Sequence, residues 1–176
     1  MTPYETFKQG NMTVHIYPDR DAESPDEWGS EDLFLIATHR QFEVKWGNFA
    51  CDQFTPERYK LDYHVLPLYA YIHGGVALSL GNGSYPFNDQ WDSGQVGWVL
   101  VKKRCGFRNI RKAAQSLVEE WNTYLSGDVW GYEIEDECGD AIASCWGYYG
   151  LEYCQQCARE QAKSLDRQLL MFEQEK

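Results

Sequence analysis

Residues 107–125, FRNIRKAAQSLVEEWNTYL, carry the clearest secondary-structure signal in the sequence. Apolar side chains recur there at intervals of three and four residues, which predicts an amphipathic helix with one buried face. Gly127 follows this segment and supplies a C-terminal stop. The expected buried face comprises Phe107, Ile110, Ala114, Leu117, Val118, Trp121 and Leu125.

A second amphipathic helix is expected over residues 151–172, with Cys154 on its apolar stripe. In residues 65–80, VLPLYAYIHGGVALSL, two buried strands are expected on either side of a turn at 73–75. Because no strand–helix unit repeats, the sequence predicts an α+β fold with a mostly antiparallel sheet packed by two amphipathic helices. Alternating patterns predict further strands at residues 13–17, 33–37, 42–46, 95–103, 129–136 and 141–146, the last two forming a hairpin.

The length of 176 residues predicts a single domain over residues 1–176, with an acidic loop at 18–32 and a core at 33–172. No apolar run approaches the roughly 20 residues that a membrane-spanning helix needs. The first ten residues also lack the basic start and apolar centre of a signal peptide. We therefore expect a cytoplasmic protein without a membrane partner.

The charge balance is strongly acidic. Sixteen Lys and Arg against 27 Asp and Glu give a net charge of −11, which disfavours direct binding to nucleic acid. The acids crowd residues 19–32 and 128–140, whereas residues 102–112 contain only basic charges, so a polarised surface is expected. Two interpretations remain open, namely a surface for a basic partner and solvated faces that maintain solubility.

The six cysteines are expected to be reduced thiols in an intracellular protein. Cys154 and Cys157 have the spacing of a redox dithiol or half of a zinc site, with Cys138 and Cys145 as further sulfur ligands. The favoured interpretation is that all six pack as small buried apolar residues, and no metal or cofactor is assigned. The six are Cys51, Cys105, Cys138, Cys145, Cys154 and Cys157.

Catalytic motifs are weak. The four histidines are scattered, and the sequence HGG at 73–75 lacks the Gly-x-Ser-x-Gly nucleophile motif that accompanies such a loop in esterases. Asp89 and Asp92 beside Trp91 form a generic carboxylate pair. No catalytic residue is assigned. Four tryptophans are expected as core or interface anchors rather than as a platform for bases or sugars: Trp91, Trp98, Trp130 and Trp146.

Three ordered segments carry a resemblance to a family: residues 64–75, HVLPLYAYIHGG; 86–98, PFNDQWDSGQVGW; and 127–132, GDVWGY. They resemble an uncharacterised family of small acidic proteins of bacteriophages and mobile elements, over residues 64–157. The resemblance implies a role similar to that of anti-CRISPR and antirestriction proteins, which block host defence nucleases. It transfers no catalytic residues.

Charge and resemblance together predict a stoichiometric inhibitor, not an enzyme, whose carboxylates enter the basic groove of a host defence nuclease or CRISPR effector. The basic stretch at 102–112 would instead contact an acidic surface of the target or a second copy in a homodimer. The alternatives are a small hydrolase or nucleotide-processing enzyme using Asp89, Asp92 and His73, and a structural or regulatory phage protein. The expected partner-binding residues are Asp19, Asp21, Glu23, Asp26, Glu27, Trp28, Glu31, Asp32, Trp130, Glu133, Glu135, Asp136, Glu137 and Asp140.

Overall fold

The computed structural model describes residues 2–40, 42–44, 54–81, 86–87, 91–104 and 106–174. They form two compact units, a terminal unit of Met1–Glu23 and Gly127–Lys176 and a central unit of Ser24–Ser126. Each unit has one antiparallel sheet and one long helix, which confirms the predicted α+β fold with two amphipathic helices. The single domain over residues 1–176 stays a prediction, because separate cores do not determine whether the units unfold together.

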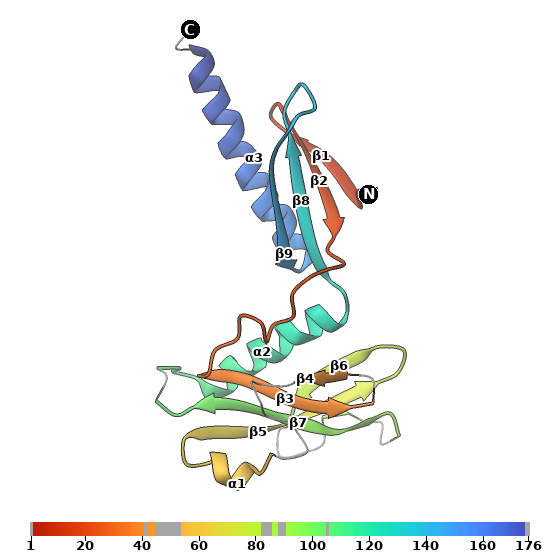
Figure 1. Cartoon of the computed structure of the whole chain (residues 1–176), viewed down its shortest axis with the longest axis vertical. Coiled ribbons are helices and arrows are strands. Elements are labelled where there is room, and N and C mark those ends of the chain that lie inside the picture. Colours follow the sequence, from red (N-terminus) through yellow and green to blue (C-terminus); the bar gives the residue numbers. More distant parts are fainter. Residues whose placement is uncertain are drawn as a thin grey trace. The chain divides into compact units, whose positions relative to one another are not determined.

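The central unit is a five-stranded sheet of order β4-β3-β7-β5-β6 (Figure 1). Helix α2 covers one face through Ala114, Val118 and Trp121, which are buried against side chains of β3, β5, β6 and β7. The short helix α1 and a group of aromatic residues pack on the other face. The elements are β3 (Leu33–His39), β4 (Phe42–Val44), α1 (Pro56–Tyr59), β5 (Tyr63–Ile72), β6 (Val76–Leu80), β7 (Ser93–Lys102) and α2 (Ile110–Leu125).

The terminal unit is a four-stranded sheet of order β1-β2-β8-β9 with helix α3 packed on one face (Figure 1). Met12, Val14 and Ile16 point from β2 toward α3, where small buried residues such as Cys154 and Ala158 let the helix lie close to the sheet. The elements are β1 (Glu5–Gln9), β2 (Met12–Pro18), β8 (Val129–Glu135), β9 (Ala141–Tyr149) and α3 (Leu151–Gln174).

The predicted strands and helices are present, with differences at their ends. Helix α2 begins at Ile110, because the Asn109 side chain accepts a hydrogen bond from the Lys112 N–H and caps the first turn. Phe107, expected on the buried face, therefore precedes the helix and is 41% exposed. Strand β1 and helix α1 were not expected, since ETFKQ contains a single apolar residue and PERY spans only one turn.

Some expectations fall outside the described residues, among them the end of the 42–46 strand, Asp89, Cys51 and Cys105. Within the described part of the chain, every helix is too short or too polar to cross a lipid bilayer.

Asn122 ties helix α2 to the edge of the central sheet. Its Oδ1 accepts a hydrogen bond from the Leu78 N–H at 2.6 Å, and its Nδ2 donates to the Leu78 carbonyl at 2.9 Å. Strand β6 is the last in the sheet order, so one amide side chain takes the place of a neighbouring strand at Leu78. The contact both fixes the helix and occupies backbone groups that would otherwise be available for pairing with another chain.

We expect Asn122→Leu to lower the free energy of unfolding by about 1–3 kcal/mol, because two half-buried backbone groups lose their partners. Gln115→Leu is the matched control, since its amide hydrogen-bonds Glu119 on the same helix. Urea unfolding monitored by circular dichroism measures both variants. Equal free energies of unfolding for the two variants would show that the hydrogen bonds between Asn122 and Leu78 contribute nothing to stability.

Candidate functional site

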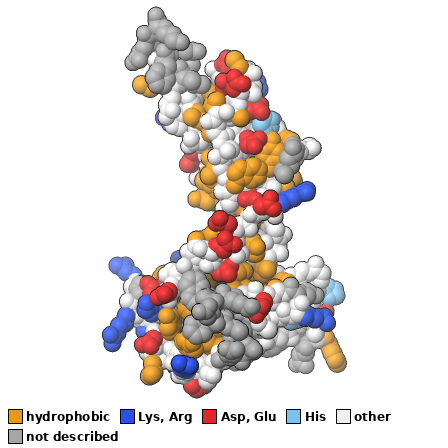
Figure 2. All heavy atoms as spheres, viewed as in Figure 1, with side chains coloured by type: hydrophobic (Ala, Val, Ile, Leu, Met, Phe, Trp, Pro, Cys, Tyr) orange, Lys and Arg blue, Asp and Glu red, His pale blue; other side chains and the backbone are white. Residues whose placement is uncertain are grey.

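Acidic charge is concentrated in the terminal unit. That unit contains 15 of the 27 Asp and Glu but 6 of the 16 Lys and Arg, so it carries −9 of the net −11. The central unit carries 12 acids and 10 bases, a net −2. Figure 2 shows acidic and hydrophobic side chains over the terminal sheet and several Lys and Arg at the edge of the central unit. The acidic surface therefore belongs to one unit.

The terminal sheet has a face directed away from α3, which we call the open face. Because side chains alternate along a strand, the residues between the core positions of β2 and β8 point to this face. Register pairs Tyr17 with Gly131 and His15 with Glu133 across the two central strands. Ser144 lies opposite Glu133 on β9. The open face consists of Thr6, Thr13, His15, Tyr17, Gly131, Glu133, Glu135, Ser144 and Trp146.

Side-chain contacts connect β2 with both of its neighbours, β1 and β8, on the open face. The His15 Nε2 lies 3.3 Å from the Glu135 Oε2, and the His15 Nδ1 lies 2.9 Å from the Thr6 Oγ1. One step along the ladder, the Tyr17 hydroxyl lies near the Glu133 carboxylate. Burial and the nearby Glu133 carboxylate raise the pKa of Tyr17, so its hydroxyl remains a donor at neutral pH. Glu135 is thus paired with His15 of the neighbouring strand β2, and Glu133 lies beside Tyr17 of that strand.

Trp146 lies on Gly131. A Cβ at Gly131 would come within 2.2 Å of the Trp146 ring, so only glycine leaves room for the indole at this position. The indole also stacks on Tyr17, with ring centroids 5.9 Å apart and an interplanar angle of 29°. Trp146 is nevertheless 43% exposed.

Several predicted contact residues have structural partners in the terminal unit. Asp136 Oδ1 accepts hydrogen bonds from the N–H groups of Cys138 and Asp140 and shapes the β8–β9 turn. Asp19 accepts from Gly147 N–H at 3.1 Å. Trp130 lies on the α3 side of the sheet and packs on Tyr4 at 4.8 Å. Glu137 and Asp140 are exposed at the turn, as are Asp21 and Glu23 in the loop that follows β2.

The acidic loop at 18–32 is divided between the units, since Asp26, Glu27, Trp28, Glu31 and Asp32 belong to the central unit. Asp32 forms an ion pair with Lys102 at 2.9 Å, which compensates one base of the 102–112 stretch. The Trp28 Nε1 donates to Glu120 Oε1 at 3.3 Å. The structure therefore brings Glu133, Glu135, Glu137 and Asp140 together on β8 and its turn, and places the second half of the acidic loop in the other unit.

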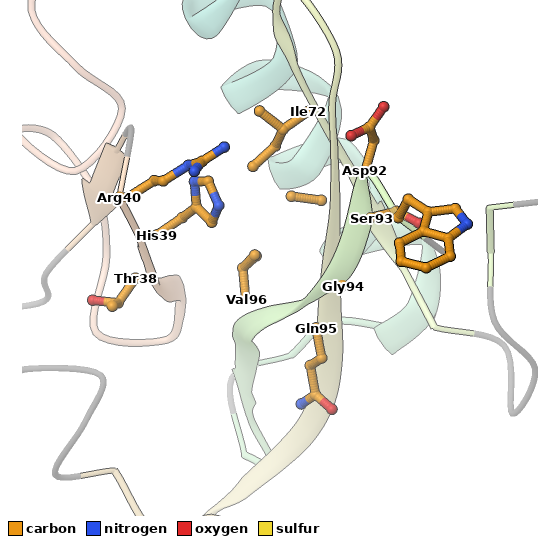
Figure 3. A pocket seen from close by; sticks show the side chains of 11 residues that line it. Thr38, His39, Arg40, Ile72, Asp92, Ser93, Gly94, Gln95 and Val96 are labelled. Carbon is orange, nitrogen blue, oxygen red and sulfur yellow. The ribbon is translucent and has the colours of Figure 1, made fainter. Parts of the chain in front are cut away.

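A polar pocket of about 220 Å³ lies in the central unit, between the end of β3 and the start of β7 (Figure 3). His39 and Arg40 point into it from one side and Asp92 lies on the other. The His73 Nδ1 lies 2.9 Å from Asp92 Oδ2, so the structure joins two residues of the alternative enzyme hypothesis. Both side chains are solvent-exposed, and Tyr71 stacks on His73 with centroids 6.2 Å apart.

The cysteines differ from the expectation of six buried thiols. Cys154 is buried against the sheet, and burial raises its pKa to about 12. Cys157 is half-buried, whereas Cys138 and Cys145 are exposed, which contradicts the prediction for these two residues. The reason is their position, since Cys138 lies in the β8–β9 turn and Cys145 on the edge strand β9. Across the residues that the structure describes, no group of three or more His, Cys, Asp or Glu is arranged to hold a metal ion.

Tyr132, which is buried, and Tyr148, which is half-buried, lie near Cys145. Burial raises the pKa values of both tyrosines, whose ring centroids are 5.5 Å apart. The neighbouring Cys145 thiol also contributes to the raised pKa of Tyr148. These groups stabilise the sheet beneath α3 and do not form part of the open face.

Comparison with known proteins adds no assignment: no family model matches the chain, and neither the curated proteins nor the solved structures contain a significant match.

The positions of His15 and Tyr17 at this site were not predicted from the sequence, and Trp146 was expected only as an anchor. The alternation of residues 13–17 and 129–135 places His15, Tyr17, Glu133 and Glu135 on the non-core side of their strands. That signal was available, but the pairing of β2 with β8 and the position of Trp146 over Gly131 depend on long-range register.

We expect iodoacetamide to modify Cys138 and Cys145 in the folded protein and to leave Cys154 unmodified until the chain unfolds. Exposure admits the reagent at the first two, while burial and the raised pKa of Cys154 keep its thiol protonated and covered. Peptide mass spectrometry after timed alkylation, with a urea-unfolded control, measures the three rates. Modification of Cys154 as fast as Cys138 under native conditions would contradict the packing of α3.

Proposed function

We propose that this protein is a stoichiometric inhibitor whose open face and β8–β9 turn bind a basic, nucleic-acid-binding groove of another protein. The observation that carries the proposal is the concentration of −9 of the net −11 charge in the terminal unit, with Glu133 and Glu135 fixed on a central strand. A groove that holds nucleic acid presents Lys and Arg, and ordered carboxylates compete for them.

The strand geometry supports this function. Residues two apart on a strand are separated by roughly 7 Å, so Glu133 and Glu135 form a row of two negative charges along the central strand β8, and Glu137 follows in the β8–β9 turn. Because the strand and its side-chain contacts fix this row in advance, little conformational entropy is lost on binding. The basic stretch at 102–112 belongs to the central unit, where Lys102 pairs with Asp32 and Arg111 donates to the Gly81 carbonyl.

The resemblance to proteins of bacteriophages and mobile elements makes a defence nuclease or CRISPR effector of the bacterial host the partner that we propose. In this role the protein acts in the host cytoplasm, binds one target per copy and turns over no substrate.

We expect Glu133→Gln/Glu137→Gln to weaken partner binding by about tenfold or more at low salt, because two uncompensated charges are removed without changing side-chain size. Asp136 is left intact because it holds the turn. The matched control is Glu152→Gln/Glu160→Gln, which removes two exposed charges from α3 on the opposite face.

The measurement is capture from bacterial lysate by the tagged protein over a salt series, with mass spectrometry and competition by DNA or RNA. Capture of a nucleic-acid-binding protein that nucleic acid displaces, and that the open-face variant loses but the control retains, supports the proposal. Equal loss in both variants would show that net charge, not this face, determines binding.

The contact of 2.9 Å between His73 and Asp92 favours a second candidate, a hydrolase in which Asp92 orients His73 as a general base beside the polar pocket. We expect Asp92→Asn to reduce turnover of any ester or nucleotide that the protein hydrolyses by about 100-fold, with Asp62→Asn as an exposed control from the same unit. Activity that is equal in both variants, in a panel of nitrophenyl esters and nucleotides, would refute this candidate.

A further inference from the structure

We infer that Trp146, stacked on Tyr17 and bordered by Glu133, is a binding site for the guanidinium group of an arginine side chain of the partner. The inference rests on the proposed function, and it names the chemical group that the open face recognises. Attraction by the acidic surface as a whole involves no particular residue, whereas this site consists of one aromatic surface and one carboxylate.

The first step is the orientation of the indole. The benzene ring of Trp146 covers the backbone of Gly131, and Tyr17 packs beside it at 5.9 Å. The ring is thus held against the sheet, while 43% of the residue remains exposed. A flat, rigid aromatic surface is held in place on a strand before any ligand arrives.

The second step is the charge beside this surface. Glu133 lies two residues along β8 from Gly131 on the same face, a separation of roughly 7 Å at the backbone. The neutral hydroxyl of Tyr17 lies near it, and within the described part of the chain no Lys or Arg pairs with it. Glu135 differs because it faces His15 at 3.3 Å. Glu133 is therefore the uncompensated carboxylate next to the indole.

The third step is the choice of ligand. A cation above an indole is attracted by the negative face of the ring, and a guanidinium can stack on the ring while its N–H groups reach a carboxylate at the side. Lysine lacks the planar group that stacks and the fork that forms paired hydrogen bonds. A nucleobase would also stack, but its phosphates are repelled by a unit of net charge −9. Charge complementarity thus selects an arginine-bearing protein segment.

The test uses three synthetic octapeptides that alternate Gly with Arg, Lys or citrulline, and isothermal titration calorimetry with the full chain at two salt concentrations. We expect the Arg peptide to bind several-fold more tightly than the Lys peptide, and the citrulline peptide, which is planar but uncharged, to bind most weakly. Trp146→Leu should weaken the Arg peptide by about 5- to 20-fold and reduce the difference between Arg and Lys.

Controls separate the site from the surface charge and from folding. Tyr153→Leu removes an exposed aromatic side chain of helix α3 in the same unit and should leave binding unchanged. Gly131→Ala keeps Trp146 but displaces its ring, so it should reproduce the loss, whereas Trp146→Phe should retain part of the preference for Arg. Glu133→Gln should lower Arg binding more than Glu137→Gln, although each removes one charge. Circular dichroism verifies that each variant is folded.

The outcomes distinguish this inference from the proposed function. If Arg and Lys peptides bind equally and Trp146→Leu has no effect, the arginine site is refuted, while salt-sensitive capture of a basic partner from lysate still supports the inhibitor. If no basic peptide binds and no basic partner is captured, both proposals fail. Binding of the citrulline peptide as tightly as the Arg peptide would refute the charge-based part of the assignment.

Discussion

The pairing of β2 with β8 is the interaction on which the terminal unit depends. In its register, Val14 lies opposite Ile134 and Ile16 opposite Tyr132 on the side covered by α3. The same register places His15 opposite Glu133 on the other side. A shift of one residue would turn the apolar set to the open face and bury the carboxylates. The same strand register therefore forms the core and places the residues of the candidate site.

The same pairing brings together the two points at which the chain leaves the terminal unit and re-enters it. Strand β2 ends at Pro18 and β8 begins at Val129, and the Asp19 N–H donates to the Val129 carbonyl at 2.8 Å. The central unit is thus an insertion between two neighbouring strands of the terminal sheet. Closing a loop of this length costs entropy that grows only slowly with the number of residues. Because the central unit has its own core, most of that ordering is stabilised by its own contacts.

The sequence was sufficient to predict the fold class, both long helices and the principal strands, because each carries a local periodicity. It was insufficient where structure depends on pairing over long distances. Strand β1 contributes only Phe7 to the core, so its local pattern is weak, and it is ordered by β2. Cys138 and Cys145 were expected to pack as small apolar residues, but they lie in a turn and on an edge strand and are exposed. The division of the acidic loop between two units likewise has no local signal.

The residues of the candidate site, too, were predicted from the sequence only in part. Glu133 and Glu135 were expected at a partner surface from charge alone, whereas Tyr17 and Trp146 come from strands 129 positions apart in the chain and meet only over Gly131. Charge and aromatic surface have different physical consequences. Long-range attraction by a unit of charge −9 accelerates encounter with any basic surface and weakens as salt rises. Contact between a guanidinium and an indole acts only at short range, depends on geometry and determines how long a correct complex persists. Under the proposed function, an acidic face without Trp146 would bind basic proteins without selection, so specificity would depend on the glycine that makes room for the ring.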